Sequence, residues 1–273
     1  MRYAIISDIH SNIQALNTAL KVLETKDIDE IVCLGDIVGY NANPSECIKV
    51  IRDHPKIKNI IKGNHDDFSS RMLSFSESLS ISQQAALGIK YSFEHISQKD
   101  KEWLQNLNTY YKEVKSNGFK FAIAHSCPMI NRGGDFWSYV LNEYDAKVNI
   151  DWWVNWDKKS KPNLCFFGHS HYPTYVEFDK KGNNITFEMG KNLDGNTYVI
   201  KKNMNYFINC GSIGQPRSDG ITSYGIVDTK ERTVKIESFE YDFSLARKAV
   251  REAGYSGEIA DRLDPNYKKN DGE

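Results

Sequence analysis

The sequence predicts an α+β (mixed α/β) fold, because alternating strand and helix patterns are followed by a long run of strands. Over about the first 110 residues, short apolar runs of strand length alternate with segments whose apolar side chains have helical spacing. Beyond them, alternating patterns separated by turn residues predict one strand after another, and a helix closes the chain. This order indicates a layered architecture with helices outside and sheets inside.

The elements of the first part are expected in the order strand, helix, strand, helix, strand and two more helices. The three strands are expected at 3–7, 30–34 and 58–61, and the last two helices at about 80–95 and 98–107. Ser11 and Gln14 predict a capping box at the start of the first helix. Asn43 and Pro44 are a typical cap and first residue for the second helix.

The second part is expected to be mostly β-structure. Asn117 and Gly118, between strand patterns at 109–115 and 120–124, form a strong hairpin signal. Further strands are expected at 164–167, 172–178, 184–189, 196–200, 206–209, 223–228 and 233–240, and a helix at 244–253. Because no repeat, low-complexity tract or linker divides the sequence, a single domain over 1–273 is expected.

The composition excludes several classes of protein. The chain has 273 residues with 35 Lys and Arg against 36 Asp and Glu, which argues against a protein that coats nucleic acid. Its 40% apolar and 12% aromatic residues are typical of a chain with a packed core. Neither a membrane-spanning run nor a signal peptide is found, so a cytoplasmic protein without a membrane partner is expected. Five cysteines without a C-x-x-C pair are expected to be reduced and mostly buried.

Residue types that bind metals follow five of the predicted strands. They are Asp8 and His10 after the first strand, Asp36 after the second, Asn64 and His65 after the third, His125 after 121–124, and His169 and His171 after 164–167. Each motif alone is also compatible with a helix cap, a surface histidine or, at Gly63, a loop that needs a positive φ. Together, at the carboxyl ends of neighbouring strands, they would face one crevice. Imidazoles, carboxylates and an amide suit Mn²⁺, Fe²⁺, Ni²⁺ or Zn²⁺ and argue against Ca²⁺.

In this order, the motifs resemble those of the calcineurin-like metallophosphoesterase superfamily over nearly the whole chain. The matching residues are Asp8-x-His10, Gly35-Asp36, Gly63-Asn64-His65-Asp66, His125 and Gly168-His169-x-His171. The segments 8–12, 35–40 and 211–217 are similar to the small bacterial and archaeal phosphodiesterase branch. The resemblance implies a four-layer αββα sandwich of two mixed β-sheets flanked by helices.

The resemblance also implies two divalent transition metal ions, with Mn²⁺ expected and Fe, Ni or Zn as alternatives. One ion would be held by Asp8, His10, Asp36 and His171, and the other by Asp36, Asn64, His125 and His169. Two such ions about 3.5–4 Å apart can activate a bridging hydroxide for in-line attack on phosphorus. His65 is expected to be the general acid and charge stabiliser. Asp66 is expected to fix the tautomer of His65 and favour its charged form, or alternatively to cap the next helix.

Some features around these motifs have two interpretations. Arg217 is a candidate contact for a substrate phosphate, or part of a surface salt bridge. An aromatic-rich segment, 129–161, is expected to be a cap, and it contains four of the five tryptophans: Trp137, Trp152, Trp153 and Trp156. Packing or a protomer contact is favoured for them over stacking on a nucleobase, and Tyr40 is similarly ambiguous. Departures from the branch at 126, at 209–212 and after Arg217 are expected to reshape the substrate rim.

The functional hypothesis is therefore a metal-dependent hydrolase of phosphodiesters or nucleotides. The alternatives are a dinucleoside polyphosphate hydrolase, a phosphomonoesterase or protein phosphatase, and a binding scaffold on the same fold. The complete ligand set and His65 argue against the scaffold. The expected partner is a small phosphoester or nucleotide, without extended nucleic-acid binding, and a homo-oligomer is left open.

Overall fold

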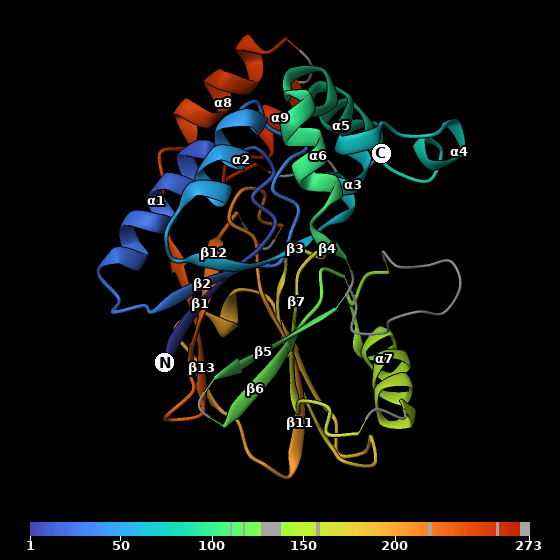
Figure 1. Ribbon diagram of the computed structural model, residues 1–273, viewed down its shortest axis with the longest axis vertical. Helices are drawn as coiled ribbons and strands as arrows, with labels where there is room; N and C mark the ends of the chain where they lie inside the picture. The colour runs from blue at the N-terminus through green and yellow to red at the C-terminus, as the bar shows by residue number, and fades with distance from the viewer. Residues whose placement is uncertain are drawn as a thin grey trace.

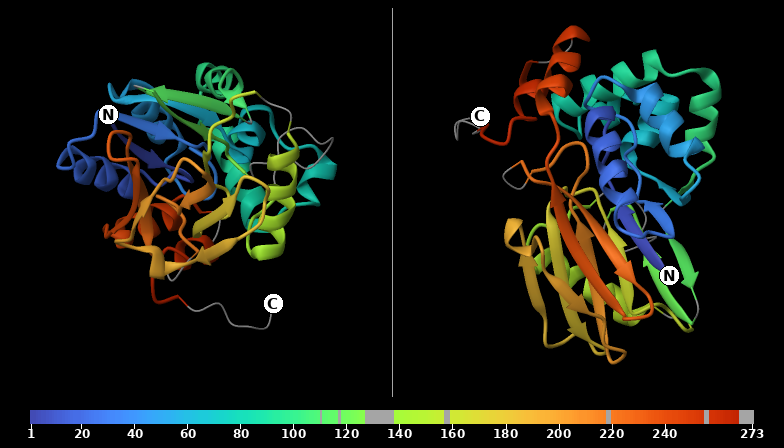
Figure 2. Two further views of the ribbon diagram at one scale, coloured as in Figure 1. Left: turned by 90° about the horizontal axis from the view of Figure 1, so that it is seen from below. Right: turned by 90° about the vertical axis from the view of Figure 1, so that its left-hand side faces the viewer.

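The computed structural model describes residues 1–109, 111–116, 118–126, 138–156, 159–217, 220–254 and 257–267. Two β-sheets are stacked face to face, with helices on the outer side of each (Figure 1). In the right-hand view of Figure 2, the blue to green helices and the red C-terminal helices lie together above the strands. This is the predicted four-layer αββα sandwich.

The first sheet has seven strands in the order β10-β13-β12-β1-β2-β3-β4. They are β1 (Arg2–Ile6), β2 (Glu30–Cys33), β3 (Ile57–Lys62), β4 (Asn108–Thr109), β10 (Thr197–Val199), β12 (Thr222–Asp228) and β13 (Thr233–Phe239). The strands β1 to β4 are parallel to one another, whereas β12 is antiparallel to both β1 and β13. The sheet is therefore mixed, as predicted.

The second sheet has six strands in the order β5-β6-β7-β11-β8-β9. They are β5 (Lys112–Ser116), β6 (Phe119–Ile123), β7 (Leu164–Phe167), β8 (Pro173–Asp179), β9 (Thr186–Met189) and β11 (Met204–Cys210). The strands β6, β7 and β11 are parallel, and the other pairs are antiparallel. The pair β5–β6 is the predicted hairpin, with Ser116 opposite Phe119. Gly118 has a φ of +80°, and Asn117 lies outside the described residues.

Helices cover both outer faces of this sandwich. They are α1 (Ile13–Glu24), α2 (Pro44–Asp53), α3 (Asn64–Arg71), α4 (Phe75–Ser78), α5 (Gln83–His95), α6 (Gln98–Gln105), α7 (Glu143–Asn155), α8 (Phe243–Glu252), α9 (Gly257–Asp261) and a short 3₁₀ turn at Lys191–Leu193. The first strand shows how the layers are separated. Ala4 and Ile6 pack under α1 and α2, whereas Tyr3 and Ile5 pack between the two sheets.

The fourth layer is α7, which packs on the outer face of the second sheet (Figure 1). Trp153 is fully buried there and meets Phe207 edge to face at 5.3 Å. Trp152 and Trp156 stack at 4.9 Å in the same cluster. These three tryptophans therefore pack in the core under α7, which is the interpretation that the sequence favoured over stacking on a nucleobase. Trp137 and residues 129–136 of the expected cap lie outside the described residues.

Three further expectations can be compared with the structure. Asn12, and not Ser11, caps α1, because the Asn12 side chain accepts a hydrogen bond from the Ala15 N–H at 3.0 Å. Cys33, Cys47, Cys165 and Cys210 are buried free thiols, and Cys127 lies outside the described residues. Among the described helices, none has the length and apolar character needed to cross a membrane.

Glu237 on β13 offers a test of the electrostatics of the first sheet. Its carboxylate accepts hydrogen bonds from Lys235 at 2.6 Å and from the Tyr224 hydroxyl at 2.9 Å, and it pairs with Lys26 at 2.9 Å. Burial alone would raise the pKa of Glu237, but these three partners lower it to about 2. Glu237→Gln is therefore expected to reduce the free energy of unfolding at pH 7 by about 1–2 kcal/mol.

The pH dependence of this loss has a defined sign. Because the pKa is lower in the folded chain, the stabilisation is complete at neutral pH and is lost as the pH falls from about 4.5 towards 2. Urea unfolding of wild type and Glu237→Gln should therefore differ most at pH 7 and converge in acid. Glu231→Gln is the control, since that side chain is 64% exposed, and a pH-independent difference for Glu237→Gln would contradict the prediction.

Candidate metal centre

The seven candidate metal ligands all lie just beyond the carboxyl ends of parallel strands. They are Asp8 and His10 after β1, Asp36 after β2, Asn64 after β3, His125 after β6, and His169 and His171 after β7. None of them is more than 6% exposed. The two sheets thus bring together residues that are up to 163 positions apart in sequence, in the arrangement that the sequence predicted.

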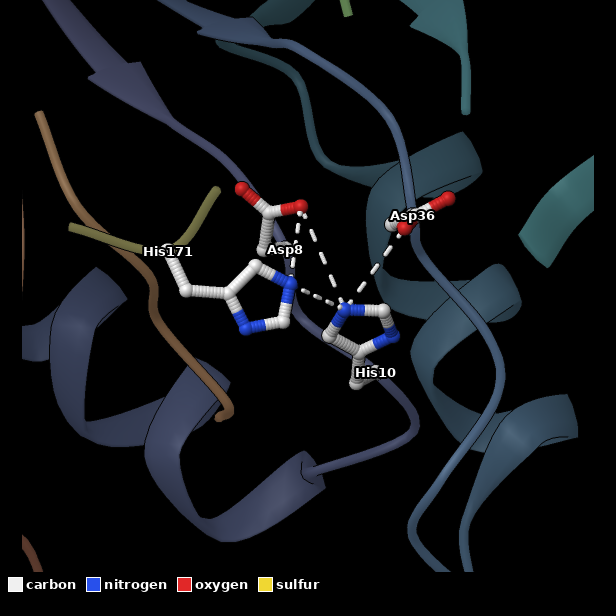
Figure 3. A group of neighbouring side chains, drawn as sticks. All are labelled: Asp8, His10, Asp36 and His171. Carbon is white, nitrogen blue, oxygen red and sulfur yellow. Dashed lines mark hydrogen bonds and ion pairs between the residues drawn. The ribbon is translucent and has the colours of Figure 1, made fainter. Parts of the chain in front are cut away.

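Four of these residues form a first cluster, shown in Figure 3. Ligand atoms of Asp8, His10, Asp36 and His171 all lie within 4.8 Å of one another. The Nε2 atoms of His10 and His171 are 3.0 Å apart. The Nε2 atom of His171 lies 3.4 Å from Asp8 Oδ1, and that of His10 lies 3.6 Å from Asp36 Oδ2. The side chains therefore converge on one point.

A second cluster shares Asp36 with the first. Ligand atoms of Asp36, His125 and His169 lie within 4.8 Å of one another. The Nε2 atom of His125 is 3.3 Å from Asp36 Oδ2 and 3.2 Å from the amide oxygen of Asn64. Asp36 Oδ2 is thus adjacent to His10 on one side and to His125 on the other. It is buried and has no hydrogen-bond partner among the described residues, which is how an oxygen that bridges two cations would be left.

In three of the candidate histidine ligands, the ring nitrogen that points away from the cluster is hydrogen-bonded to the backbone. The Nδ1 atoms of His10, His125 and His171 each contact a backbone carbonyl oxygen. The acceptors are Val38 at 3.2 Å, Leu34 at 2.7 Å and Gln215 at 2.6 Å, respectively. Because a carbonyl oxygen only accepts, Nδ1 carries a proton in each ring, which leaves Nε2 as the nitrogen that faces the cluster. The residues present therefore fit borderline divalent cations.

The backbone of the cluster is strained. Five of the seven candidate ligands have a positive φ, which is uncommon for residues other than glycine. They are Asp8 at 54°, His10 at 49°, Asp36 at 50°, His169 at 64° and His171 at 62°. Such conformations persist where the surrounding structure enforces them, and they concentrate at functional sites. The strain therefore favours a functional interpretation over an ordinary set of turns.

The electrostatics of the cluster also point to a cation. Burial raises the pKa of Asp8 to about 7, and burial lowers the pKa values of His10 and His171 well below the usual range. Burial opposes the ionisation of Asp36 as well, but His125 and His65 hold its pKa well below the usual range. Burial also opposes the charge on His125, but Asp36 raises the pKa of His125 to about 9, so in the metal-free chain this imidazole supplies positive charge that bound divalent ions would replace.

Comparison with known proteins identifies the family. A sequence model of the calcineurin-like phosphoesterase superfamily domain matches residues 1–232. The chain belongs to this superfamily. An uncharacterized protein of Methanocaldococcus jannaschii is 35% identical over 250 residues, which cover 90% of each chain.

Solved structures agree with this assignment. A metallophosphoesterase from Sphaerobacter thermophilus is 26% identical and superposes with a TM-score of 0.75, over 96% of this chain and 98% of that one. A hypothetical protein of Pyrococcus horikoshii OT3 shares the fold, with a TM-score of 0.71 and 19% identity over 96% of this chain and 97% of that one. This phosphoesterase is therefore a member of a family of phosphoester hydrolases that bind divalent metals, and its buried Asp and His cluster is the candidate site.

His65 lies in the first turn of α3, beside the metal cluster of the phosphoesterase. Its backbone N–H donates to Asp36 Oδ1 at 2.8 Å, and its ring lies 4.7 Å from the ring of His10. Burial lowers the pKa of His65 to about 4, so the expectation that its charged form is favoured is wrong for the chain without metal. The position beside the candidate ligands is nevertheless the one that an acid or charge stabiliser would need.

The hydrogen bonds of Asp66 differ from those expected from the sequence. Its Oδ1 accepts the N–H groups of Ile37 at 2.8 Å and Val38 at 3.1 Å, and its Oδ2 accepts that of Gly63 at 3.0 Å. Among the described residues, no hydrogen bond joins it to the His65 ring, so the prediction that it fixes the tautomer of His65 is wrong. The alternative, a cap for α3, is confirmed with a different position: Gly63 is the N-cap, and Asp66 is the third residue of the helix, whose carboxylate accepts the Gly63 N–H as in a capping box. Asp66 holds the loop after β2 against α3.

The rim of the site contains Arg217 and a residue that the sequence did not single out. Arg217 is exposed, and its guanidinium carbon lies 5.6 Å from the centre of the Tyr139 ring. Tyr139 in turn stacks on His169 at 4.2 Å. Among the described residues Arg217 makes no ion pair, so the expected surface salt bridge is not found. Tyr139 was missed because it belongs to none of the motifs and precedes α7 in an irregular segment.

Within 209–212 the residue that departs from the branch is Cys210, which is buried in the core between the two sheets and does not lie at the rim of the site. Asn209 is buried and donates to the Gly168 carbonyl oxygen and to Ser170 Oγ, each at 2.9 Å. Ser212 is also buried and donates to the Asp8 carbonyl oxygen at 2.8 Å. These side chains support the loops that hold Asp8 and the two histidines after β7. The expectation that this segment reshapes the substrate rim is therefore wrong.

Proposed function

We propose that this phosphoesterase hydrolyses phosphodiesters or nucleotides with a pair of divalent ions, most readily Mn²⁺. The observation that carries the proposal is Asp36 Oδ2, which lies between two clusters of buried ligands and has no hydrogen bond among the described residues. Asp8, His10 and His171 would hold one ion and Asn64, His125 and His169 the other, with Asp36 shared. When bound, such a pair activates water and neutralises charge on phosphoryl oxygens.

The other residues of the site have complementary parts in this proposal. His65 would donate a proton to the leaving oxygen or stabilise its charge, because its ring is next to His10. Arg217 would contact a phosphoryl oxygen from the rim through its planar guanidinium. A dinucleoside polyphosphate hydrolase is the alternative on the same ligands. A cytoplasmic location, a homo-oligomer and a cap at 129–161 stay predictions of the sequence.

Metal dependence is the first test of this function. Exhaustive chelation is expected to abolish hydrolysis, and Mn²⁺ to restore it, because imidazole-rich ligand sets bind first-row transition metals. Ca²⁺ is the control and is expected to restore little, since it prefers sites made only of oxygen. Turnover and metal content are measured on the same samples. Unchanged turnover in protein shown to be free of metal would contradict the proposal.

Substrate charge is the second test. The candidate ligand motifs include no lysine, so little positive charge is left for a dianionic monoester once the ions are bound. The value of kcat/KM for bis(p-nitrophenyl) phosphate is therefore expected to be at least comparable to that for p-nitrophenyl phosphate. Both are measured at one pH with saturating Mn²⁺. A monoester preference of about tenfold, or roughly 1.4 kcal/mol, would favour the phosphomonoesterase alternative.

A further inference from the structure

Tyr40 lies against His65 and is buried, which removes both of its sequence-based interpretations. Its side chain is 5% exposed, whereas a stacking platform for a nucleobase or a protomer contact needs an exposed ring. The Tyr40 ring lies 4.7 Å from that of His65 with an interplanar angle of 31°. It also meets the His10 ring edge to face at 4.8 Å. Tyr40 thus forms one wall of the space that holds the His65 imidazole.

A second side of this space is the backbone of Gly39. A Cβ atom added to Gly39 would lie 2.2 Å from His65 Nδ1, so only glycine leaves room for the imidazole there. The Nδ1 atom is buried and makes no hydrogen bond within the described residues. His10 supplies a third side, with its ring 4.7 Å away and nearly perpendicular. Packing therefore orients the imidazole, and Nε2 is the nitrogen left to face a substrate.

The loop that carries Gly39 and Tyr40 is itself fixed from two helices. The Gly39 N–H donates at 3.1 Å to Ser92 Oγ, a fully buried hydroxyl on α5. Asp66, in α3, accepts from the two residues that precede Gly39. Tyr40 has a φ of 51°, an uncommon value that this surrounding structure enforces. Contacts from α3 and α5 therefore hold the Tyr40 ring in place against His65.

We propose that Tyr40 is a positioning residue, which holds the His65 imidazole towards the leaving oxygen of the substrate through ring packing in place of a hydrogen bond. This inference rests on the proposed function of His65. If it is right, removal of the Tyr40 ring allows the imidazole to turn away from the leaving group. The effect then depends on how much the charge on the leaving oxygen needs to be stabilised by the imidazole, which a purely structural role would not produce.

The test compares two diesters that differ only in the leaving group, methyl phenyl phosphate and methyl p-nitrophenyl phosphate. Phenolate is the more basic leaving group and depends more than nitrophenolate does on a hydrogen-bond donor at the leaving oxygen. Tyr40→Leu is expected to lower kcat for the phenyl ester by about tenfold or more, and for the nitrophenyl ester by at most about threefold. Tyr40→Phe restores the ring and is expected to recover most of the loss. Metal content is measured for each variant.

A double variant shows whether Tyr40 acts through His65. The double variant Tyr40→Leu/His65→Ala is expected to be no slower than His65→Ala alone. If Tyr40 acts only by orienting His65, its ring has no further effect once the imidazole is gone, and the two losses are not additive. Additive losses, or equal losses on both esters, would overturn the positioning role. If Tyr40→Leu does not fold, Ser92→Ala serves instead, with a smaller loss and the same dependence on the leaving group.

The outcomes separate this inference from the proposed function. If His65→Ala shows the leaving-group dependence and Tyr40→Leu does not, only the positioning role is wrong. If the wild type with bound Mn²⁺ hydrolyses neither diester, the proposed function fails. In that case the NMR chemical shifts of the His65 ring in metal-free protein still test whether Tyr40 packs against His65. These shifts are expected to change in Tyr40→Leu and to return to the wild-type values in Tyr40→Phe. Unchanged shifts in Tyr40→Leu would overturn the positioning role.

Discussion

Asp36→Asn is expected to remove both metal ions and abolish hydrolysis, whereas His65→Ala is expected to retain both ions. Asp36 Oδ2 lies 3.6 Å from His10 Nε2 and 3.3 Å from His125 Nε2, so both candidate sites lose their shared charge when the carboxylate becomes an amide. His65 contributes its backbone N–H to Asp36 but no side-chain ligand. Its loss is expected to lower kcat by about 10²–10⁴, the usual contribution of a positioned acid or charge stabiliser.

The two variants are compared by metal analysis and kinetics on one preparation each. The metal content of Asp36→Asn should fall towards zero, and that of His65→Ala should stay near that of the wild type. Loss of metal in His65→Ala would show that His65 supports the ligands and would remove its catalytic role. Full metal content in Asp36→Asn would show that the carboxylate is not shared.

The strands and the ligand set could be predicted because their signals are local. Apolar runs of strand length are visible in the sequence, and the residue types that bind metals follow directly at the strand ends. The parallel order of β1, β2 and β3, and of β6 and β7, then brings those ends together. The contact between Asn64 and His125 is different, because it joins the end of β3 in the first sheet to the end of β6 in the second and therefore depends on how the two sheets stack.

Other features depend on contacts that the sequence does not display. The helix α3 was not predicted from periodicity because its first turn, Asn64 to Asp66, is polar and buried by the site and not by an apolar stripe. Asp66 was expected to contact His65 because it is the next residue. In a helix, however, consecutive side chains point in different directions, and Asp66 faces the loop after β2 instead. Tyr139 reaches His169 only through tertiary packing.

Glycine is required at position 63 for a different reason from the one that the sequence suggested. A positive φ was one interpretation, but Gly63 has a φ of −92°, which any residue adopts. A Cβ atom added there would lie 2.1 Å from Asp36 Oδ1 and 2.4 Å from the Asp36 backbone nitrogen. The glycine is therefore needed for close approach of the loop after β3 to the shared ligand.

Gly63→Ala is accordingly expected to damage the metal site and the fold together. Because the atoms met by the new methyl group include backbone, relief requires a shift of the Asp36 loop, at a cost of about 1–3 kcal/mol in the free energy of unfolding. Displacement of the shared ligand is expected to lower metal content and to reduce kcat/KM by about 10² or more. Urea unfolding, metal analysis and kinetics measure the three effects.

Gly118→Ala is the matched control for this variant. Gly118 has a φ of +80° in the hairpin turn, and a Cβ atom added there would meet nothing within 4 Å. Alanine at 118 should therefore cost about 1–2 kcal/mol of backbone strain without changing metal content or turnover. The contrast separates close approach from backbone conformation as the reason for a glycine. If Gly63→Ala keeps its metal and its turnover, the loop after β3 does not position Asp36, and the shared-ligand geometry must depend on other contacts.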